Sequence, residues 1–326
     1  MRYIFIVNPK AGQAKGKEQY AEDINVIAET LGVPFEVYFT KGIGDAETFT
    51  RSVGESAAES GEEVRIVACG GDGTLNEVLN GAIAYDNLVV GVVPMGTGND
   101  FARNFPEAGD FLSVKAQLMG SVVKCDCIRY HGMLDHKEQT RYCANMFNIG
   151  FDCNVVDTTA VMKTKPLMAG SMAYLASVAT TLIKRKGANL RIVADGKELN
   201  NGPILLTSIA NGSYCGGGVM SNPYASVHDG KIDLSVINIV SRTKFITLFP
   251  SYSKGTHLEK KSIEKIITNL KADHVEITPL DDKGRLCTDG EISDMEGTIE
   301  FDVIKDGFNL LIPKKFDQDF GHQLKL

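Results

Sequence analysis

The sequence predicts two domains, an α/β domain followed by a β-rich domain, and three observations support this prediction. The chain has 326 residues, more than a single hydrophobic core usually organises. Over roughly the first 130 residues, short apolar runs alternate with helical patterns, as they do around a parallel sheet. Beyond that point strand-like alternation dominates and helical patterns become sparse, which is typical of an antiparallel sheet or sandwich.

The first part contains four predicted strands with helices between them. The strands cover residues 3–8, 33–40, 64–69 and 88–93, and the helices cover 16–31, 45–60 and 74–84. In the first helix, apolar side chains recur with the 3–4 spacing of an amphipathic helix. Each strand ends in a loop that is rich in glycine or contains proline. Since open α/β sheets bind ligands beyond the carboxyl ends of their strands, we expect these loops to form the site.

The second part contains six predicted strands and two predicted helices. The strands cover 141–149, 190–194, 204–211, 231–240, 274–279 and 298–303, and the helices cover 168–184 and 242–252. The uncharged stretch 166–183 approaches the length of a membrane span. Its many small and hydroxyl-bearing residues give it a low mean hydropathy, so we expect a buried or pocket-lining helix and no transmembrane segment.

The composition argues against several classes of protein. The 34 basic and 41 acidic residues give a net charge of −7, whereas a nucleic-acid partner needs a basic surface. The first residues have only a short apolar run and no cleavage site of a secretory signal. Seven cysteines, of which only Cys125 and Cys127 form a close pair, fit neither a disulfide framework nor a zinc site. We therefore expect a cytoplasmic protein.

The strongest local motif is GGDGTLNE, residues 70–77, which lies between a predicted strand and a predicted helix. Its three glycines allow a sharp turn and close approach of the backbone to a ligand. Thr74 and Glu77 have the spacing of a capping box, so the start of the helix should face the loop and attract phosphate. The Asp72 carboxylate would repel a bare phosphate. It could instead bind a magnesium ion that lies between the carboxylate and the phosphate, or it could order the backbone amides of the loop.

Two further loops follow predicted strands in the same way. NPKAG, residues 8–12, follows the first strand, and PMGTGNDFAR, residues 94–103, follows the fourth. Three such loops at the carboxyl ends of parallel strands predict a nucleotide-phosphate site. The site matches neither the P-loop, because Lys17 is followed by Glu18, nor the dinucleotide fingerprint, because Phe101 stands where its third glycine is needed.

These three motifs, in this order, resemble the diacylglycerol kinase catalytic-domain family, which includes bacterial diacylglycerol kinases, related lipid kinases and sphingosine kinases. NIGFD at 148–152, DG at 229–230 and DGE at 289–291 also lie where that family has similar signatures. The resemblance covers nearly the whole chain. It implies a three-layer α/β nucleotide-binding domain similar to that of phosphofructokinases and NAD kinases, formed by residues 1–128 and 306–326. Residues 129–305 would form an antiparallel β-sandwich that binds the lipid substrate.

The resemblance also implies a lipid kinase that depends on ATP and Mg²⁺. Phosphoryl transfer to an alcohol needs a phosphate cradle, a metal ion and a carboxylate that accepts the hydroxyl proton. The expected nucleotide-binding residues are Asn8, Gly12, Gly70, Gly71, Asp72, Gly73, Thr74, Gly96, Thr97 and Asn99. The expected metal-binding residues are Asp72, Asp100 and Asp126, with a second, structural magnesium at Asp229 and Asp233. Two alternatives to metal binding are left open: Asp126 could have a buried structural role, and Asp229 could lie in a solvated turn.

Asp289, in the DGE motif, is the expected catalytic base. If residues 289–291 are extended, Asp289 and Glu291 face the same side and bring two carboxylates to one site, where Glu291 would orient or assist. Gly290 would leave room for a ligand. Asp72 is the competing candidate for the base.

Diacylglycerol, which would yield phosphatidic acid, is the first candidate acceptor, ahead of a sphingoid base or another long-chain lipid. The alternatives are an enzyme similar to NAD kinases, which share GGDGT, and a regulator that binds nucleotide or lipid without catalysis. The stretch 166–183 is the candidate wall of the lipid pocket. Contact with the inner face of an anionic membrane is assigned to Lys254, Lys260, Lys261 and Lys265 together with residues 184–186. Whether the protein forms a homodimer is left open.

Overall fold

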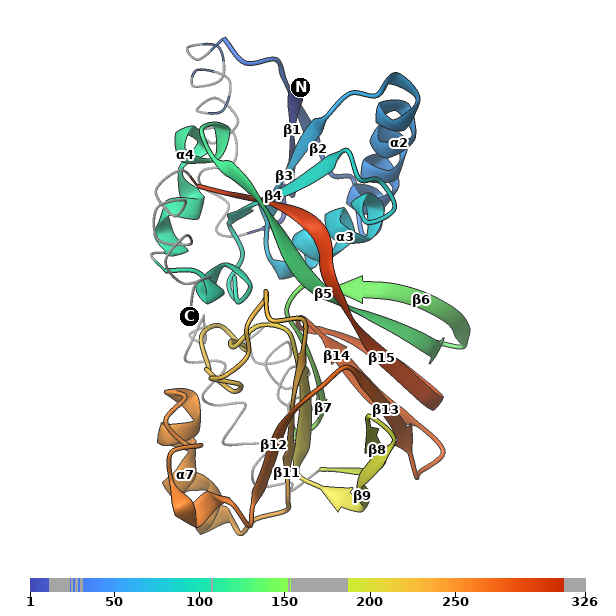
Figure 1. The fold of residues 1–326 in the computed structure, drawn as a ribbon, viewed down its shortest axis with the longest axis vertical. Helices are drawn as coiled ribbons and strands as arrows, with labels where there is room; N and C mark the ends of the chain where they lie inside the picture. The colour runs from blue at the N-terminus through green and yellow to red at the C-terminus, as the bar shows by residue number, and fades with distance from the viewer. Residues whose placement is uncertain are drawn as a thin grey trace. The chain divides into compact units, whose positions relative to one another are not determined.

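The computed structural model describes residues 1–11, 24, 26, 29, 32–106, 108–151, 153 and 187–313 (Figure 1). The chain divides into two compact units, Met1–Asp126 with Asp306–Leu326, and Cys127–Lys305. The first unit is α/β and the second is built mainly of strands, so the predicted fold class is confirmed. The predicted helix 168–184 lies outside the described residues, as does most of the predicted helix 16–31.

A parallel sheet forms the centre of the first unit. Its strands are β1 (Arg2–Val7), β2 (Phe35–Phe39), β3 (Val64–Gly70) and β4 (Leu88–Pro94), in the order β2-β1-β3-β4. Two residues of the long strand β15 (Glu291–Ile312), Asn309 and Leu310, add to the free side of β4. The chain places β2 on one side of β1 and β3 on the other, so the carboxyl ends of β1 and β3 form a switch point at which such sheets bind ligands.

Helices cover both faces of this sheet (Figure 1). On one face, α2 (Asp45–Ser60) packs against α3 (Asp72–Ala82), which contacts β3 and β4. On the other face, Val114 and Leu118 of α4 (Val114–Leu118) join a buried cluster with side chains of β1, β3 and β4. Between β4 and α4 lie two short 3-10 helices, η1 (Ala102–Asn104) and η2 (Ala108–Leu112).

The predicted capping box of α3 is wrong. The helix begins at Asp72, after an N-cap at Gly71 that makes no side-chain hydrogen bond. Glu77 instead accepts hydrogen bonds from the backbone N–H groups of Gly44 (2.9 Å) and Ala46 (3.0 Å), at the start of α2. The free amides and the dipole of α2 favour a carboxylate there. Because α2 packs against α3, Glu77 binds the start of α2 and does not cap its own helix.

The second unit consists of strands whose two halves enclose one apolar core. One half contains β7 (Met146–Gly150), β10 (Leu206–Ala210), β11 (Ile232–Ile237), β12 (Ile267–Ala272) and β14 (Gly284–Thr288), in the order β12-β11-β10-β7-β14. The other contains β5 (Ser121–Leu134), β6 (Lys137–Cys143), β8 (Ala188–Ala194), β9 (Lys197–Ile204) and β13 (His274–Pro279). The long strand β15 pairs with β14 near its start and with β13 further along, so it belongs to both halves.

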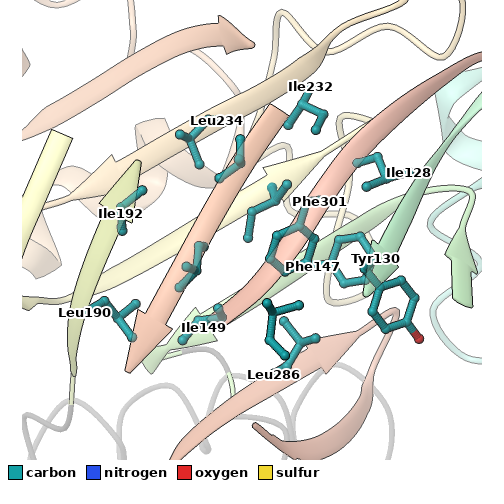
Figure 2. Close-up of a cluster of buried hydrophobic side chains, with 14 of the residues drawn as sticks. Ile128, Tyr130, Phe147, Ile149, Leu190, Ile192, Ile232, Leu234, Leu286 and Phe301 are labelled. Carbon is teal, nitrogen blue, oxygen red and sulfur yellow. The ribbon is translucent and has the colours of Figure 1, made fainter. Parts of the chain in front are cut away.

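Side chains from both halves meet in the core of this unit (Figure 2). Phe147 of β7 packs against Phe301 of β15, with ring centroids 5.0 Å apart, and against Tyr130 of β5 at 4.8 Å. Ile192 of β8 and Leu234 of β11 are also fully buried there. The predicted sandwich is thus an antiparallel assembly closed by aromatic and aliphatic residues.

Some predicted boundaries differ from those observed. The predicted strand 141–149 is two strands, β6 and β7, because the Asn145 carbonyl leaves the ladder and accepts hydrogen bonds from Asn211 N (2.8 Å) and Gly212 N (2.9 Å). The predicted strand 298–303 is part of the 22-residue strand β15. Helix α7 (Arg242–Ser253) lies where a helix was predicted, and the short η3 (Lys261–Ile263) follows it. No helix among the described residues has the length and hydropathy of a membrane span.

Candidate functional site

Two of the predicted loops touch at the carboxyl edge of the parallel sheet. The backbone N–H of Met95 donates to the carbonyl of Gly70 at 2.7 Å. The backbones of Gly71 and Gly96 approach so closely that a Cβ on Gly96 would lie 2.5 Å from the Gly71 Cα. No other residue type fits at position 96 without movement of the backbone, so the glycines permit this contact.

The first loop joins the same edge through Asn8. Its side-chain amide donates to the Thr74 hydroxyl at 3.1 Å, while its Oδ1 accepts from the backbone N–H of Lys10 at 2.9 Å. The Thr74 hydroxyl also lies where a side chain on Gly70 would have to sit. The structure therefore brings Asn8, Gly70, Gly71, Thr74 and Gly96 together, as predicted, whereas Gly12 lies outside the described residues.

Asn99 shapes the third loop from within. Its backbone has a φ of 56°, a left-handed conformation that asparagine tolerates better than most residues. Its Oδ1 accepts from Gly96 N (2.8 Å) and its Nδ2 donates to Gly96 O (2.9 Å). Asn99 thus closes the loop, while Thr97 at the tip is exposed.

Two carboxylates converge on the open side of Gly98. A Cβ on Gly98 would lie 2.9 Å from Oδ2 of Asp72 and 3.4 Å from Oδ2 of Asp100. Oδ1 of Asp72 also accepts a hydrogen bond from the backbone N–H of Phe101 at 3.3 Å. Carboxylate oxygens are the ligands that Mg²⁺ prefers, so Asp72 and Asp100 could hold a magnesium ion beside the phosphates of a nucleotide.

The environment of Asp72 favours a cation nearby. Burial raises the pKa of Asp72 above its ordinary value, and backbone N–H groups of Phe101, Asn99 and Asp100 offset this only in part. Ionised Asp72 is therefore poorly compensated by the protein alone. A bound cation would favour the ionised carboxylate and lower its pKa.

The other predicted metal ligands also have protein partners, as Asp100 has in Arg103, whose Nε lies 3.7 Å from its Oδ1. Asp126 is fully buried, and its Oδ1 accepts from the backbone N–H of Asp306 at 2.8 Å. Asp229 forms an ion pair with Lys271, and Asp233 is buried on β11, where Asn269 donates to it at 2.8 Å. In the part of the chain that the structure describes, no three His, Cys, Asp or Glu side chains gather as a metal-binding group. Both magnesium sites remain predictions.

Asp289 lies in a tight turn of the second unit, between β14 and β15. Asp289 and Gly290 both have positive φ, 46° and 91°, and the flanking Thr288 and Glu291 pair across the hairpin. Positive φ at both central residues is what a type I′ hairpin turn requires, and asparagine, aspartate and glycine adopt it most easily. The assumption that 289–291 is extended is therefore wrong, and strand alternation does not bring Glu291 to the same site.

The Asp289 carboxylate is held by two donors. Its Oδ1 accepts from the backbone N–H of Met146 at 3.2 Å, and its Oδ2 accepts from the Cys143 thiol at 3.1 Å. Burial, together with the charge of Asp289, raises the pKa of Cys143 well above its ordinary value, so the thiol stays protonated and donates. Asp289 is only half-buried, so its carboxylate has a fixed orientation and access to solvent.

Sequence reasoning missed an apolar cavity in the second unit. It contains about 630 Å³ of space, part of it open to solvent. Its lining residues are Phe151, Leu205, Leu206, Cys215, Val219, Ile237, Val240, Phe245, Leu248, Phe249, Tyr252, His257, Ile263, Ile266 and Ile267. Four of them recur along α7 at positions 245, 248, 249 and 252, which is a one-sided helical spacing that could have indicated this surface.

A chain of contacts links this cavity to Asp289. Cys215 in the cavity wall donates to the Ser221 hydroxyl at 3.5 Å, and Ser221 donates to the sulfur of Met146 at 3.6 Å. Met146 is the residue whose amide binds Asp289. Further along β7, Gly150 pairs with the cavity residue Leu206. The strand from Met146 to Gly150 spans about 13 Å, and its five residues are buried.

His257 is the most polar residue of the cavity wall. It is only 1% exposed, and neither ring nitrogen forms a hydrogen bond of normal geometry with the described residues. Burial lowers its pKa to about 4, although the nearby Ser251 carbonyl opposes this shift. Its ring lies against Tyr252, with centroids 4.8 Å apart. The imidazole is therefore neutral at physiological pH.

Acid should destabilise the protein through His257. The pKa is about 4 in the folded protein and 6.5 ordinarily, so between these values only the unfolded chain gains the proton. The free energy of unfolding should fall by roughly 3 kcal/mol through this group as the pH drops across that window. Urea denaturation at about pH 7 and about pH 4.5 would measure this, and His257→Gln should lose less stability than the wild type. Equal losses in the two proteins would contradict the assignment.

Two family models and several curated proteins match this chain. Residues 2–130 match a family model described as the diacylglycerol kinase catalytic domain, and residues 145–302 match one described as the YegS C-terminal NAD kinase beta sandwich-like domain. Diacylglycerol kinase of Bacillus subtilis (strain 168) is 30% identical over 294 residues, which is 89% of each chain. Diacylglycerol kinase of Mycobacterium tuberculosis (strain ATCC 25618 / H37Rv) is 28% identical over 235 residues, or 72% of each chain.

A solved structure shows the same fold. The crystal structure of a diacylglycerol kinase from Bacillus anthracis str. Sterne superposes with a TM-score of 0.69 at 20% identity, over 97% of this chain and 98% of that chain. The glycine loops lie within the part that matches the catalytic-domain model, and Asp289 within the part that matches the sandwich model. The chain therefore belongs to the diacylglycerol kinase family, a family of lipid kinases.

Proposed function

We propose that this enzyme uses ATP and Mg²⁺ to phosphorylate the free hydroxyl of diacylglycerol, forming phosphatidic acid. The choice of diacylglycerol as the acceptor rests on the apolar cavity. The cavity gives an acyl chain a place to bind and is linked by contacts to Asp289. Burial of hydrocarbon there contributes roughly 0.8 kcal/mol per CH₂ group. A soluble acceptor such as NAD would gain nothing from such a cavity.

The carboxyl edge of the parallel sheet, where Gly71 and Gly96 meet, suits the triphosphate of ATP. The N-terminus of α3 has no side-chain cap, and the partial positive charge of a helix N-terminus favours phosphate oxygens there. Gly71 and Gly96 keep side chains away from this surface. Magnesium, held by Asp72 and Asp100, would neutralise charge on the phosphates during transfer.

Asp289 suits the role of base. As the acceptor oxygen bonds to the γ-phosphorus, the bond from that phosphorus to the bridging oxygen breaks and ADP leaves. The hydroxyl proton passes to the Asp289 carboxylate. The Met146 amide and the Cys143 thiol hold that carboxylate in one orientation, as general-base catalysis requires.

Asp289→Asn should abolish transfer while leaving ATP affinity nearly unchanged. Asparagine tolerates the left-handed backbone of this turn but cannot accept the proton, so kcat should fall at least about 100-fold. The measurement is transfer of label from radiolabelled ATP to diacylglycerol, sphingosine, monoacylglycerol or NAD. Asp282→Asn, at an exposed aspartate before β14, is the matched control and should keep full activity.

Each outcome of this assay has a distinct meaning. Label in sphingosine would keep the mechanism and change the acceptor, whereas label in NAD would overturn the lipid assignment. Full activity of Asp289→Asn would refute the choice of base. ATP binding without any transfer by the wild type would favour a regulator without catalysis.

Gly98→Ala tests the magnesium position. The new methyl group would lie 2.9 Å from Oδ2 of Asp72 and would push the two carboxylates apart. The Kd for ATP in the presence of magnesium, measured by calorimetry, should rise at least about tenfold. Gly42→Ala adds the same methyl group where nothing lies within 4 Å and should leave the Kd unchanged. An unchanged Kd in Gly98→Ala would argue against metal binding there.

The enzyme should contact the membrane that holds its substrate, and the segment around α7 is the proposed surface. Lys254, Lys260, Lys261 and Lys265 are exposed, and Ile246 on α7 is 62% exposed. Other residues of α7 line the cavity, so lipid bound there would enter beside this surface. Basic side chains near an anionic leaflet contribute about 1 kcal/mol each. We therefore propose peripheral attachment to the inner face of the membrane.

Lys260→Glu/Lys261→Glu should reduce sedimentation of the protein with phosphatidylglycerol vesicles at least about tenfold, because four units of charge change on that surface. Lys137→Glu/Lys197→Glu makes the same charge change at exposed lysines on β6 and β9 and is the control. Similar losses in both variants would show that net charge matters and the α7 surface does not.

A further inference from the structure

We propose that His257 donates a hydrogen bond to an acyl ester carbonyl in the apolar cavity and thereby makes the enzyme selective for ester-linked over ether-linked lipids. This inference rests on the proposed function, since it takes a glycerolipid as the acceptor. It adds a specificity-determining residue that lies outside the glycine loops and the DGE turn.

The first argument is the unmet hydrogen-bonding capacity of His257. The side chain is 1% exposed in the wall of the cavity, and both Nδ1 and Nε2 lack hydrogen bonds of normal geometry with the described residues. Such a group destabilises the folded protein, because its bonds to water are lost on folding. Buried polar groups of native proteins nearly always have partners, so a ligand in the cavity is the natural candidate.

The second argument concerns the chemistry of the partner. A neutral imidazole carries one N–H donor and one lone pair. Nearly all other lining residues are apolar, so a cationic amine would lose its hydration without a counter-charge. An uncharged oxygen acceptor satisfies the N–H without that loss. In diacylglycerol the ester carbonyls are the uncharged acceptors that are not the reacting hydroxyl.

The third argument is the position of His257 within the cavity. The segment that carries it contacts the loop before β11, because Met220 N donates to Ser253 O at 3.1 Å. The next residue of that loop, Ser221, contacts Met146, whose amide binds Asp289. His257 thus belongs to the end of the cavity that leads to the proposed base. The ester groups of diacylglycerol lie close to its hydroxyl, so an ester carbonyl reaches this end while the chain fills the remainder.

The test compares dioleoylglycerol with its dioleyl diether, which lacks both carbonyls, as acceptors in mixed micelles. For the wild type, KM should be about tenfold lower for the ester. His257→Phe should raise KM for the ester about tenfold and leave kcat and the diether KM unchanged. His257→Gln, which keeps a donor, should retain most of the selectivity. Phe249→Leu alters the apolar wall of the cavity and should affect both lipids alike.

Thermal unfolding separates this role from a structural one. His257→Phe removes two buried nitrogens that form no hydrogen bond of normal geometry with the described residues, so Tm should stay level or rise. If the wild type had equal KM values for the ester and the ether, the role of His257 would be refuted while the proposed function stood. The same would follow if His257→Phe raised KM equally for both lipids. A wild type that phosphorylates neither glycerolipid would overturn the proposed function and this inference with it.

Discussion

The carboxyl edge of the parallel sheet closes only because Gly71 and Gly96 have no side chains. Their backbones meet at a distance that a single Cβ would prevent. This contact holds the loop after β3 against the loop after β4, and so places Asp72 and Asp100 on the same side of Gly98. The raised pKa of Asp72 follows from the same closure, because the loops that meet there also shield its carboxylate from water.

In the second unit, the two faces of the half that contains β7, β10 and β11 have different surroundings. On one face, Phe147, Leu234 and their neighbours pack with side chains of the opposite half in the buried core (Figure 2). On the other, Leu206 and Ile237 meet the half-buried residues of α7 across the cavity. The face towards α7 also carries Asn148, Ser208 and Ser235, so only the first face is a continuous apolar core. Met146, whose amide binds Asp289, and Leu206 lie on this second face, with Asn148 and Ser208 between them.

Local sequence patterns predicted the elements that carry a strong pattern of their own. Continuous apolar runs predicted β1, β3 and β4, and the glycine motifs predicted the loops that end them. The errors arose where a distant partner decided the structure. Glu77 has the right spacing for its own helix but binds the start of α2, and Asn145 leaves its strand to bind Asn211 and Gly212. The cavity needs residues from β10, β11, β12 and α7, so the apolar spacing along α7 could indicate only one of its walls.

The long strand β15 has a consequence for synthesis on the ribosome. Asn309 donates a hydrogen bond to the carbonyl of Leu88, 221 residues earlier, so the sheet of the first unit receives its last strand after nearly all of the second unit has been made. The first unit must wait, with the side of β4 unpaired, while strands of the second unit emerge. An unpaired edge during that interval invites strand exchange or binding by a chaperone. Completion of the first unit is thereby coupled to folding of the second.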